Sequence, residues 1–286
     1  RQRQMCIRDR IALFADTIIA SFLAAGAVSA LYYADRLNQL PIGVIGIAAG
    51  TVLLPEMARR IAADDDKGAQ DAQNRAAELT LLLTVPCLVA FVLVPELIMR
   101  ALFGRGAFTS ANASAAAATL MAYAIGLLPF VLMRSATVTF QARGDTSTPV
   151  KALFVAVIVN VALKVLLMDR FAQVGLAFAT SVGAWVNLGL LLWFAARRNL
   201  IVVDARLRSS LGKLAVAGVV LAVALYFGNM VLVRISAAWP FRDELMLAAL
   251  CLVGLVVYGG VLAILFGRQL KALVRPGSKA SAPPTN

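Results

Sequence analysis

The sequence predicts an all-α fold, a polytopic bundle of transmembrane helices, and three observations support this prediction. Apolar residues make up 61% of the 286 residues, and the mean hydropathy of +0.83 is far above that of a soluble domain. Apolar runs rich in Leu, Ala and Val recur along the whole chain. These runs are continuous rather than alternating, which favours membrane helices over the strands of a membrane barrel.

Eight of these runs are long enough to cross a bilayer, for which a helix needs about 20 apolar residues. They cover residues 11–26, 28–58, 76–99, 112–142, 150–168, 173–196, 212–233 and 245–266. Residues 1–10 look like a non-native segment joined to the middle of a longer chain, and we expect them to lie outside the fold. Residues 59–75 predict a charged amphipathic linker at the cytoplasmic surface, and residues 268–286 a disordered cytoplasmic tail.

The basic residues indicate topology rather than a nucleic-acid partner. The formal net charge is +12, but the charges are scattered over the short connections between the spans and form no single basic face. If the first span runs outward from the cytoplasm, fifteen basic residues lie in the cytoplasmic connections and the tail, and five lie in the outer connections. This bias predicts a multi-pass plasma-membrane protein with both ends in the cytoplasm.

Enzymatic chemistry is not expected. The chain has no histidine, and Cys6, Cys87 and Cys251 have neither metal-ligand nor disulfide spacing, so we predict no metal centre and no cofactor. A membrane-embedded glycosyltransferase or phosphatase would need histidines or clustered carboxylates at a membrane face. The acidic cluster Asp64–Asp66 lies instead in the linker. A passive scaffold would leave an intramembrane arginine unexplained.

That arginine, Arg36, lies in the second span beside Asp35. Counted along a helix, it is about 12 Å below the outer end of the span, and a cation at such a depth costs about 3 kcal/mol or more. We therefore predict that Arg36 faces a water-filled cavity and binds an anionic substrate group, with Asp35 and Gln39 as neighbours in the site. Pro41 and Gly43 predict a hinge after it. Alternatively, Asp35 and Arg36 mark the membrane edge or pair with neighbouring helices.

Other polar side chains fall within predicted spans. Arg134 is a second intramembrane cation, which either binds substrate or reaches carboxylates on other helices. Asn160 and Lys164 lie four residues apart, on one helical face, and Thr180 lies in the next span. Asn and Thr side chains commonly join membrane helices by hydrogen bonds. The ammonium of Lys164 requires an acid, and Asp16 in the first span is the candidate.

Seven short stretches carry a family resemblance when they are taken together at their spacing: residues 20–26, 32–37, 40–41, 43–44, 50–51, 53–55 and 148–151. With them, the chain resembles the C-terminal part of the MurJ (MviN) lipid II flippases over nearly all of residues 11–275. These flippases belong to the multidrug/oligosaccharidyl-lipid/polysaccharide exporter superfamily. The resemblance implies that the eight spans are helices seven to fourteen of a fourteen-helix transporter.

The resemblance also implies a function and a domain division. Such a transporter would carry lipid II across the bacterial inner membrane by alternating access, for peptidoglycan biosynthesis, with membrane lipids and the cell-wall synthesis machinery as further partners. Residues 11–58 would end the N-lobe, residues 76–208 would form a four-helix C-lobe, and residues 209–267 two helices with a lipid-tail groove. An alternative is an exporter of another polyprenyl-linked oligosaccharide or of drugs. The energy source stays open among membrane potential, sodium and protons.

Individual residues carry roles by the same resemblance. Arg36 matches the essential cavity arginine of the family's eighth helix. Asp16, Asn160 and Thr180 match the cation site of sodium-coupled members, but Lys164 stands where those members have an acid. The resemblance therefore implies that the lysine ammonium takes the place of the ion and pairs with Asp16.

Overall fold

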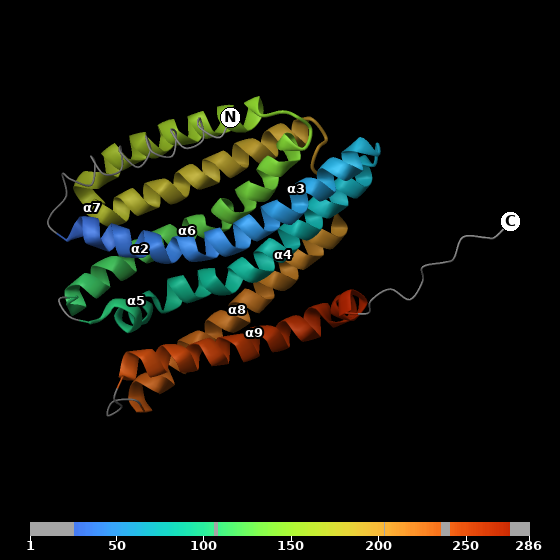
Figure 1. The fold of residues 1–286 in the computed structure, drawn as a ribbon. Coiled ribbons are helices and arrows are strands. Elements are labelled where there is room, and N and C mark those ends of the chain that lie inside the picture. The colour runs from blue at the N-terminus through green and yellow to red at the C-terminus, as the bar shows by residue number, and fades with distance from the viewer. Residues whose placement is uncertain (1–25, 106–107, 203, 236–240, 275–286) are drawn as a thin grey trace.

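The structure is a bundle of long helices (Figure 1). This computed structural model describes residues 26–105, 108–202, 204–235 and 241–274, and the regular elements within them are all helical. In this part of the chain, six helical segments are long and apolar enough to cross a membrane. The predicted all-α membrane fold is confirmed.

The elements follow the predicted runs closely. They are α2 (Ala27–Pro41), the π-helix η1 (Ile42–Gly46), α3 (Ile47–Ala62), α4 (Asp66–Leu93), α5 (Pro95–Phe103), α6 (Ser110–Gln141), α7 (Ser147–Arg197), α8 (Ala205–Ile235) and α9 (Arg242–Val274). The second predicted span becomes the continuous rod α2–η1–α3. The first predicted span, 11–26, lies almost wholly outside the described residues.

Helix α6 is the centre of the bundle. It packs against α2, η1 and α3, against α4 and α5, and against α7. Small residues allow these close contacts: a Cβ added to Gly126 would lie 2.8 Å from the Cα of Ser181 on α7. The hydroxyl of Ser181 donates a 2.6 Å hydrogen bond to the carbonyl of Ala122. Small residues at helix crossings, joined by such hydrogen bonds, are typical of membrane bundles.

Helix α7 is a hairpin of two crossings. As a straight helix its 51 residues would extend about 77 Å, more than twice the thickness of the hydrocarbon core. The chain reverses at Ala172, which has φ 45° and ψ −129°. The halves then pack side by side, because a Cβ on Gly175 would meet the carbonyl oxygen of Leu167 at 2.8 Å, and one on Gly183 would meet Asn160 Cβ at 2.9 Å. The two halves correspond to predicted spans 150–168 and 173–196.

Three boundaries differ from the predicted ones. The run 76–99 is broken, since α4 ends at Leu93 and α5 starts at Pro95, which lacks the N–H that a continuous helix requires. Residues 59–75, the predicted linker, comprise the end of α3, a short turn and the first turns of α4. Helix α9 continues to Val274, into the predicted tail, and residues 275–286 lie outside the described part.

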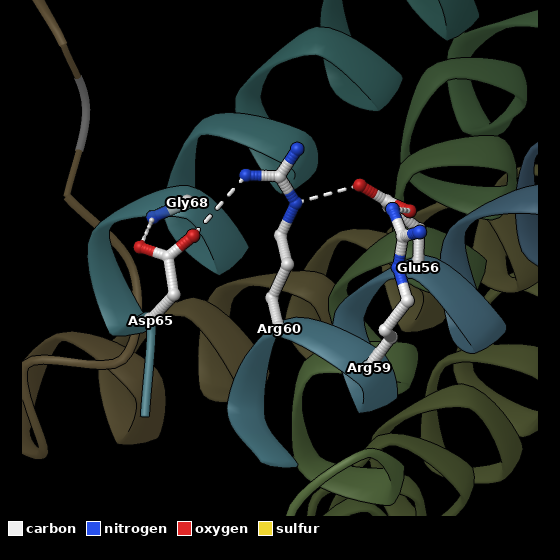
Figure 2. Close-up of polar contacts among 5 residues, drawn as sticks. All are labelled: Glu56, Arg59, Arg60, Asp65 and Gly68. Atoms are coloured by element: carbon white, nitrogen blue, oxygen red, sulfur yellow. Dashed lines mark hydrogen bonds and ion pairs between the residues drawn. The ribbon is translucent and has the colours of Figure 1, made fainter. Parts of the chain in front are cut away.

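The corner between α3 and α4 is held by a chain of ionic contacts (Figure 2). Arg60 lies between two carboxylates, with its Nε 2.6 Å from Glu56 Oε1 and its Nη1 3.4 Å from Asp65 Oδ2. Asp65 also accepts a 2.8 Å hydrogen bond from the backbone N–H of Gly68 and so caps α4. Asp65 of the acidic cluster 64–66 therefore has a structural role at this corner.

A second capping carboxylate closes the α7 hairpin. Asp145 Oδ1 accepts the backbone N–H of Thr148 at 3.0 Å, and its Oδ2 accepts the Thr148 hydroxyl at 2.6 Å. Arg198, at the far end of α7, donates to the same carboxylate at 2.6 Å. The bonds from Thr148, followed by that from Arg198, hold the pKa of the Asp145 carboxyl well below its usual value. Asp145 therefore joins the two ends of the hairpin.

We expect Asp145→Ala to lower the stability of the folded protein by about 1 kcal/mol, as the loss of a helix cap typically does. Because the pKa is lowered on folding, the contribution of Asp145 is present above the unfolded pKa and is lost only as the pH falls through the lower folded pKa. The difference between variant and wild type should therefore stay constant from about pH 6 to 8. Thermal unfolding in detergent measures it, with Asp169→Ala, an exposed carboxylate, as control. An equal shift in both variants would contradict this account.

Candidate functional site

Arg36 lies on the face of α2 that points away from the centre of the bundle. The opposite face packs towards α6 through Ala30, Ala34 and Leu37, each at most 6% exposed. The exposed face carries Val28, Tyr32, Arg36, Gln39, Leu40 and, in η1, Val44. The guanidinium therefore lies on a surface that the described helices leave uncovered.

The nearest contact of Arg36 is aromatic. Its guanidinium carbon lies 4.9 Å from the ring centre of Tyr32, one turn earlier. The adjacent Tyr33 packs against the rings of Phe103 and Phe108, with centroids at 4.7 and 5.3 Å, and fixes this end of α2 to the α5–α6 connection. Among the described residues Arg36 has no carboxylate partner. The described part thus gives no support to the alternative that a neighbouring acid neutralises Arg36.

Asp35 and Gln39 pair with each other. The amide Nε2 of Gln39 donates a hydrogen bond to Asp35 Oδ2, one helical turn away. Asp35 is half-buried, whereas Arg36 and Gln39 are exposed. The predicted site residues of α2 therefore lie on adjoining strips of one helix, with Asp35 turned away from Arg36.

The helix changes its geometry just after Arg36. Pro41 lacks the N–H of a normal helical ladder, and the next residues, Ile42–Gly46, form a wider π-helical turn. The predicted local deformation at Pro41 and Gly43 is present in the structure. Its use as a hinge stays a prediction.

Arg134 lies on α6 beside this deformed turn. Its side chain passes over Gly46, so closely that a Cβ on the glycine would be 2.6 Å from Arg134 Cδ and 3.0 Å from Nε. Arg134 is exposed and has no hydrogen-bond or ion-pair partner in the described part of the chain. The sequence predicts two roles for Arg134, and for one of them, pairing with a carboxylate, the described residues provide no partner.

The predicted ion-site residues are only partly brought together. Lys164 is 3% exposed and engaged in a polar or electrostatic contact, and Asn160 lies one turn before it. The Thr180 hydroxyl bonds its own helix, at Leu176 O, with a distance of 3.0 Å. Asp16 lies outside the described residues, so its pairing with Lys164 stays a prediction. Within the described ranges, no three His, Cys, Asp or Glu side chains come together as metal ligands.

One buried acid was missed by the sequence reasoning. Glu78 on α4 is 8% exposed, accepts a 2.7 Å hydrogen bond from the Ser210 hydroxyl and lies 3.5 Å from Arg206, both on α8. Glu78 and Arg206 border a hollow of about 190 Å³. An acid within an apolar run is the signal that could have identified it. The contact fastens the α8–α9 hairpin to α4.

The other end of that hairpin is fastened as well. Near the connection between α8 and α9, Arg100 Nε lies 3.4 Å from Asp243, and Arg105 lies 3.0 Å from Glu244. The hydroxyl of Tyr258 adds a 2.8 Å hydrogen bond to a carbonyl of α4. The hairpin is thus attached to α4 and α5 along its length (Figure 1).

A protein-family model described as Lipid II flippase MurJ matches residues 6–267. The chain belongs to this family. It is 34% identical over 259 residues to the "Probable lipid II flippase MurJ" of Rickettsia prowazekii (strain Madrid E), which covers 91% of the chain and 50% of the relative. It is 37% identical over 278 residues to the protein of the same description from Rhizobium meliloti (strain 1021), covering 96% and 52%. The chain thus spans about half the length of these MurJ relatives.

Solved structures share the fold. A structure titled "Lipid II flippase MurJ, inward closed conformation" superposes with a TM-score of 0.76 at 23% identity, covering 91% of this chain and 51% of that one. An outward-facing multidrug resistance MATE family transporter of the MOP superfamily gives 0.59 at 17% identity, covering 91% and 61%. The agreement supports the helical arrangement of this MurJ family chain.

The exposure of Arg36 predicts a pattern of chemical labelling. With the native cysteines replaced, Arg36→Cys should react with a charged, membrane-impermeant thiol reagent, because this face is exposed, whereas Leu37→Cys should not, because Leu37 is 6% exposed and packs in the core. Labelling in cells expressing the full-length transporter measures both. If Arg36→Cys reacted only with a lipid-soluble reagent, the position would face lipid rather than water.

Proposed function

We propose that these residues form the C-terminal half, helices seven to fourteen, of a transporter that flips lipid II across the bacterial inner membrane. The single observation that supports this most is the exposed guanidinium of Arg36, in a candidate membrane span and without a described carboxylate partner, in a chain of the MurJ family. A charge so placed is costly unless water or an anion meets it.

The chemistry of Arg36 suits a diphosphate. A guanidinium presents a rigid fork of N–H donors that binds phosphate oxygens in pairs, and it remains charged at any physiological pH. Charge-assisted hydrogen bonds of this kind are stronger where the dielectric is lower than in water. The headgroup can be released again because the same face is open to water when no anion is bound. The uncovered face of α2 would then face the other half of the transporter across the cavity.

The charge distribution supports the proposed orientation. Arg143 and Arg198 join the connections at one end of the bundle through ion pairs of 2.9 and 2.6 Å. Arg100 and Arg105 lie at the opposite end. The end with the larger number of basic residues in the sequence would face the cytoplasm. Both chain ends would then be cytoplasmic, and the first of the described helices would run inwards.

A second candidate function is the export of another polyprenyl-linked oligosaccharide or of drugs. The similarity in fold to a multidrug MATE transporter supports this second candidate. A flipping assay in vesicles separates the two, because unlabelled lipid II should compete with labelled lipid II, and a cationic drug should not. Competition by the drug alone would favour the second function.

The proposed role of Arg36 leads to a graded prediction. In a full-length transporter containing these residues, Arg36→Ala should abolish growth of a flippase-depleted strain, whereas Arg36→Lys, which keeps the charge but loses the fork, should impair it less. Arg59→Ala is the matched control, because Arg59 is a surface arginine with 76% of its side chain exposed. Normal growth with Arg36→Ala would refute the assignment.

We further propose that Lys164 takes the place of a coupling ion. Lys164 is 3% exposed, in the half-helix that also carries Asn160, and occupies the position where sodium-coupled relatives are expected to have an acid. Flipping should therefore be equally fast when sodium is replaced by potassium or choline. A several-fold loss of rate without sodium would show that an ion is still required.

A further inference from the structure

We propose that Gly46 is a positioning residue that seats Arg134, and that Arg134 forms a second phosphate contact at a different depth from Arg36. This inference rests on the proposed function, since it assigns a further residue to the path of the same lipid-linked diphosphate. It starts from the contact between the last residue of η1 and the side chain of Arg134.

The backbone does not require glycine at position 46. Its φ of −69° and ψ of −38° are those of an ordinary right-handed helix, which any residue adopts. The position of Arg134 does favour it, because a Cβ would lie 2.6 Å from Arg134 Cδ and would displace the arginine side chain. Gly43, in the same π-turn, has open space at its Cβ position. The glycine at 46 is therefore explained by the arginine that lies against it.

Helix α6 is held in place on both sides of Arg134. The side-chain amide of Asn187 on α7 contacts Met133 Sδ, and Ser135 Oγ accepts a 3.0 Å hydrogen bond from Gln73 on α4. These contacts fix the position of the α6 backbone at Arg134. The direction of its guanidinium then depends on the surface over which its aliphatic stem lies, and that surface is Gly46.

The arginine so placed has no internal task. In the described part of the chain it makes neither a hydrogen bond nor an ion pair, and it is exposed. The structure thus holds a permanently charged group firmly by its stem and leaves its donors free. That arrangement fits the capture of an external anion better than the stabilisation of the fold.

The placement of Arg36 and Arg134 suits successive contacts with one anion that moves along the rod α2–η1–α3. Helix α6 runs in the same direction as α2–η1–α3, since Tyr33 meets Phe108 before the start of α6 and Gly46 meets Arg134 near its end. Arg36 and Gly46 are ten residues apart, which corresponds to roughly 15 Å along the rod. The two guanidiniums therefore offer donors at two successive depths, and the ligand class is a diphosphate that moves between them.

A double-mutant cycle in the full-length transporter tests the inference. The probe is undecaprenyl pyrophosphate, which carries the diphosphate without the sugar, and the readout is its dissociation constant for purified protein. Arg134→Ala should weaken binding by about tenfold, the usual effect of losing a charged hydrogen-bond donor. Gly46→Ala should weaken it by a similar factor, and the double variant should be no weaker than Arg134→Ala alone.

Controls separate a positioning role from a structural one. Gly189→Ala also replaces a helical glycine with open space at its Cβ position, and it should bind the probe as tightly as the wild type. Gly46→Ala should unfold at nearly the wild-type temperature, because the Cβ displaces a flexible side chain rather than backbone. If Gly46→Ala fails to fold, adding Arg134→Ala should restore the folded protein by removing the clash.

Three results would overturn the inference: an undiminished effect of Gly46→Ala in the Arg134→Ala background, unchanged probe binding by Arg134→Ala, or no rescue of a misfolded Gly46→Ala by the second change. A different measurement tests the proposed function itself. Normal growth of the flippase-depleted strain with Arg36→Ala would refute that function, whereas probe binding to the purified protein measures the coupling between Gly46 and Arg134.

Discussion

The close packing of small residues around α6 is the constraint on which the rest of the structure depends. In a bilayer, lipid tails are as apolar as leucine side chains, so helices associate through tight packing and hydrogen bonds rather than through the hydrophobic effect. The contact of Gly126 with Ser181 brings α7 against one side of α6, and alanines of α2 pack on another. Larger residues at these crossings would separate the helices and remove the hydrogen bond from Ser181 to Ala122.

This packing decides which polar groups are used inside the bundle and which remain outside it. Ser181, Ser135 and Glu78 are buried and have hydrogen-bond partners on neighbouring helices, so they contribute to assembly. Arg36 and Arg134 lie at the edges of the same contacts and have no such partner among the described residues. The division between polar groups that join helices and those proposed to bind an anion thus follows from the position of each one relative to α6.

Much of the architecture could be predicted from the sequence, because hydrocarbon leaves the backbone few alternatives. Most of the span limits, the deformation at Pro41 and the separation of Asp35 from Arg36 follow from apolar length, from the missing N–H of proline and from helical periodicity. Contacts between helices distant in the sequence could not be predicted, because they depend on packing. The pairing of Glu78 with Ser210 and the seat of Arg134 on Gly46 are of this kind.

The break at Val94 shows the same limit at a smaller scale. Hydropathy treats residues 76–99 as one run, because Val94 and Pro95 are apolar. The proline ends the hydrogen-bond ladder regardless of its hydropathy, and α5 starts in a new direction that brings Arg100 to α9. The short apolar helix α5 therefore connects α9 to the rest of the bundle rather than extending the span of α4.

The cations in the candidate membrane spans differ in surroundings according to whether they are lysine or arginine. Lys164 is enclosed and engaged in a contact within the chain, as a compact ammonium at the end of a flexible stem allows. Arg36 and Arg134 are exposed, and each is held by an uncharged surface, the ring of Tyr32 in one case and the backbone of Gly46 in the other. Such surfaces orient a guanidinium without neutralising it. In the proposed function, each guanidinium would therefore still attract a passing anion, and would bind it weakly enough alone for the anion to leave.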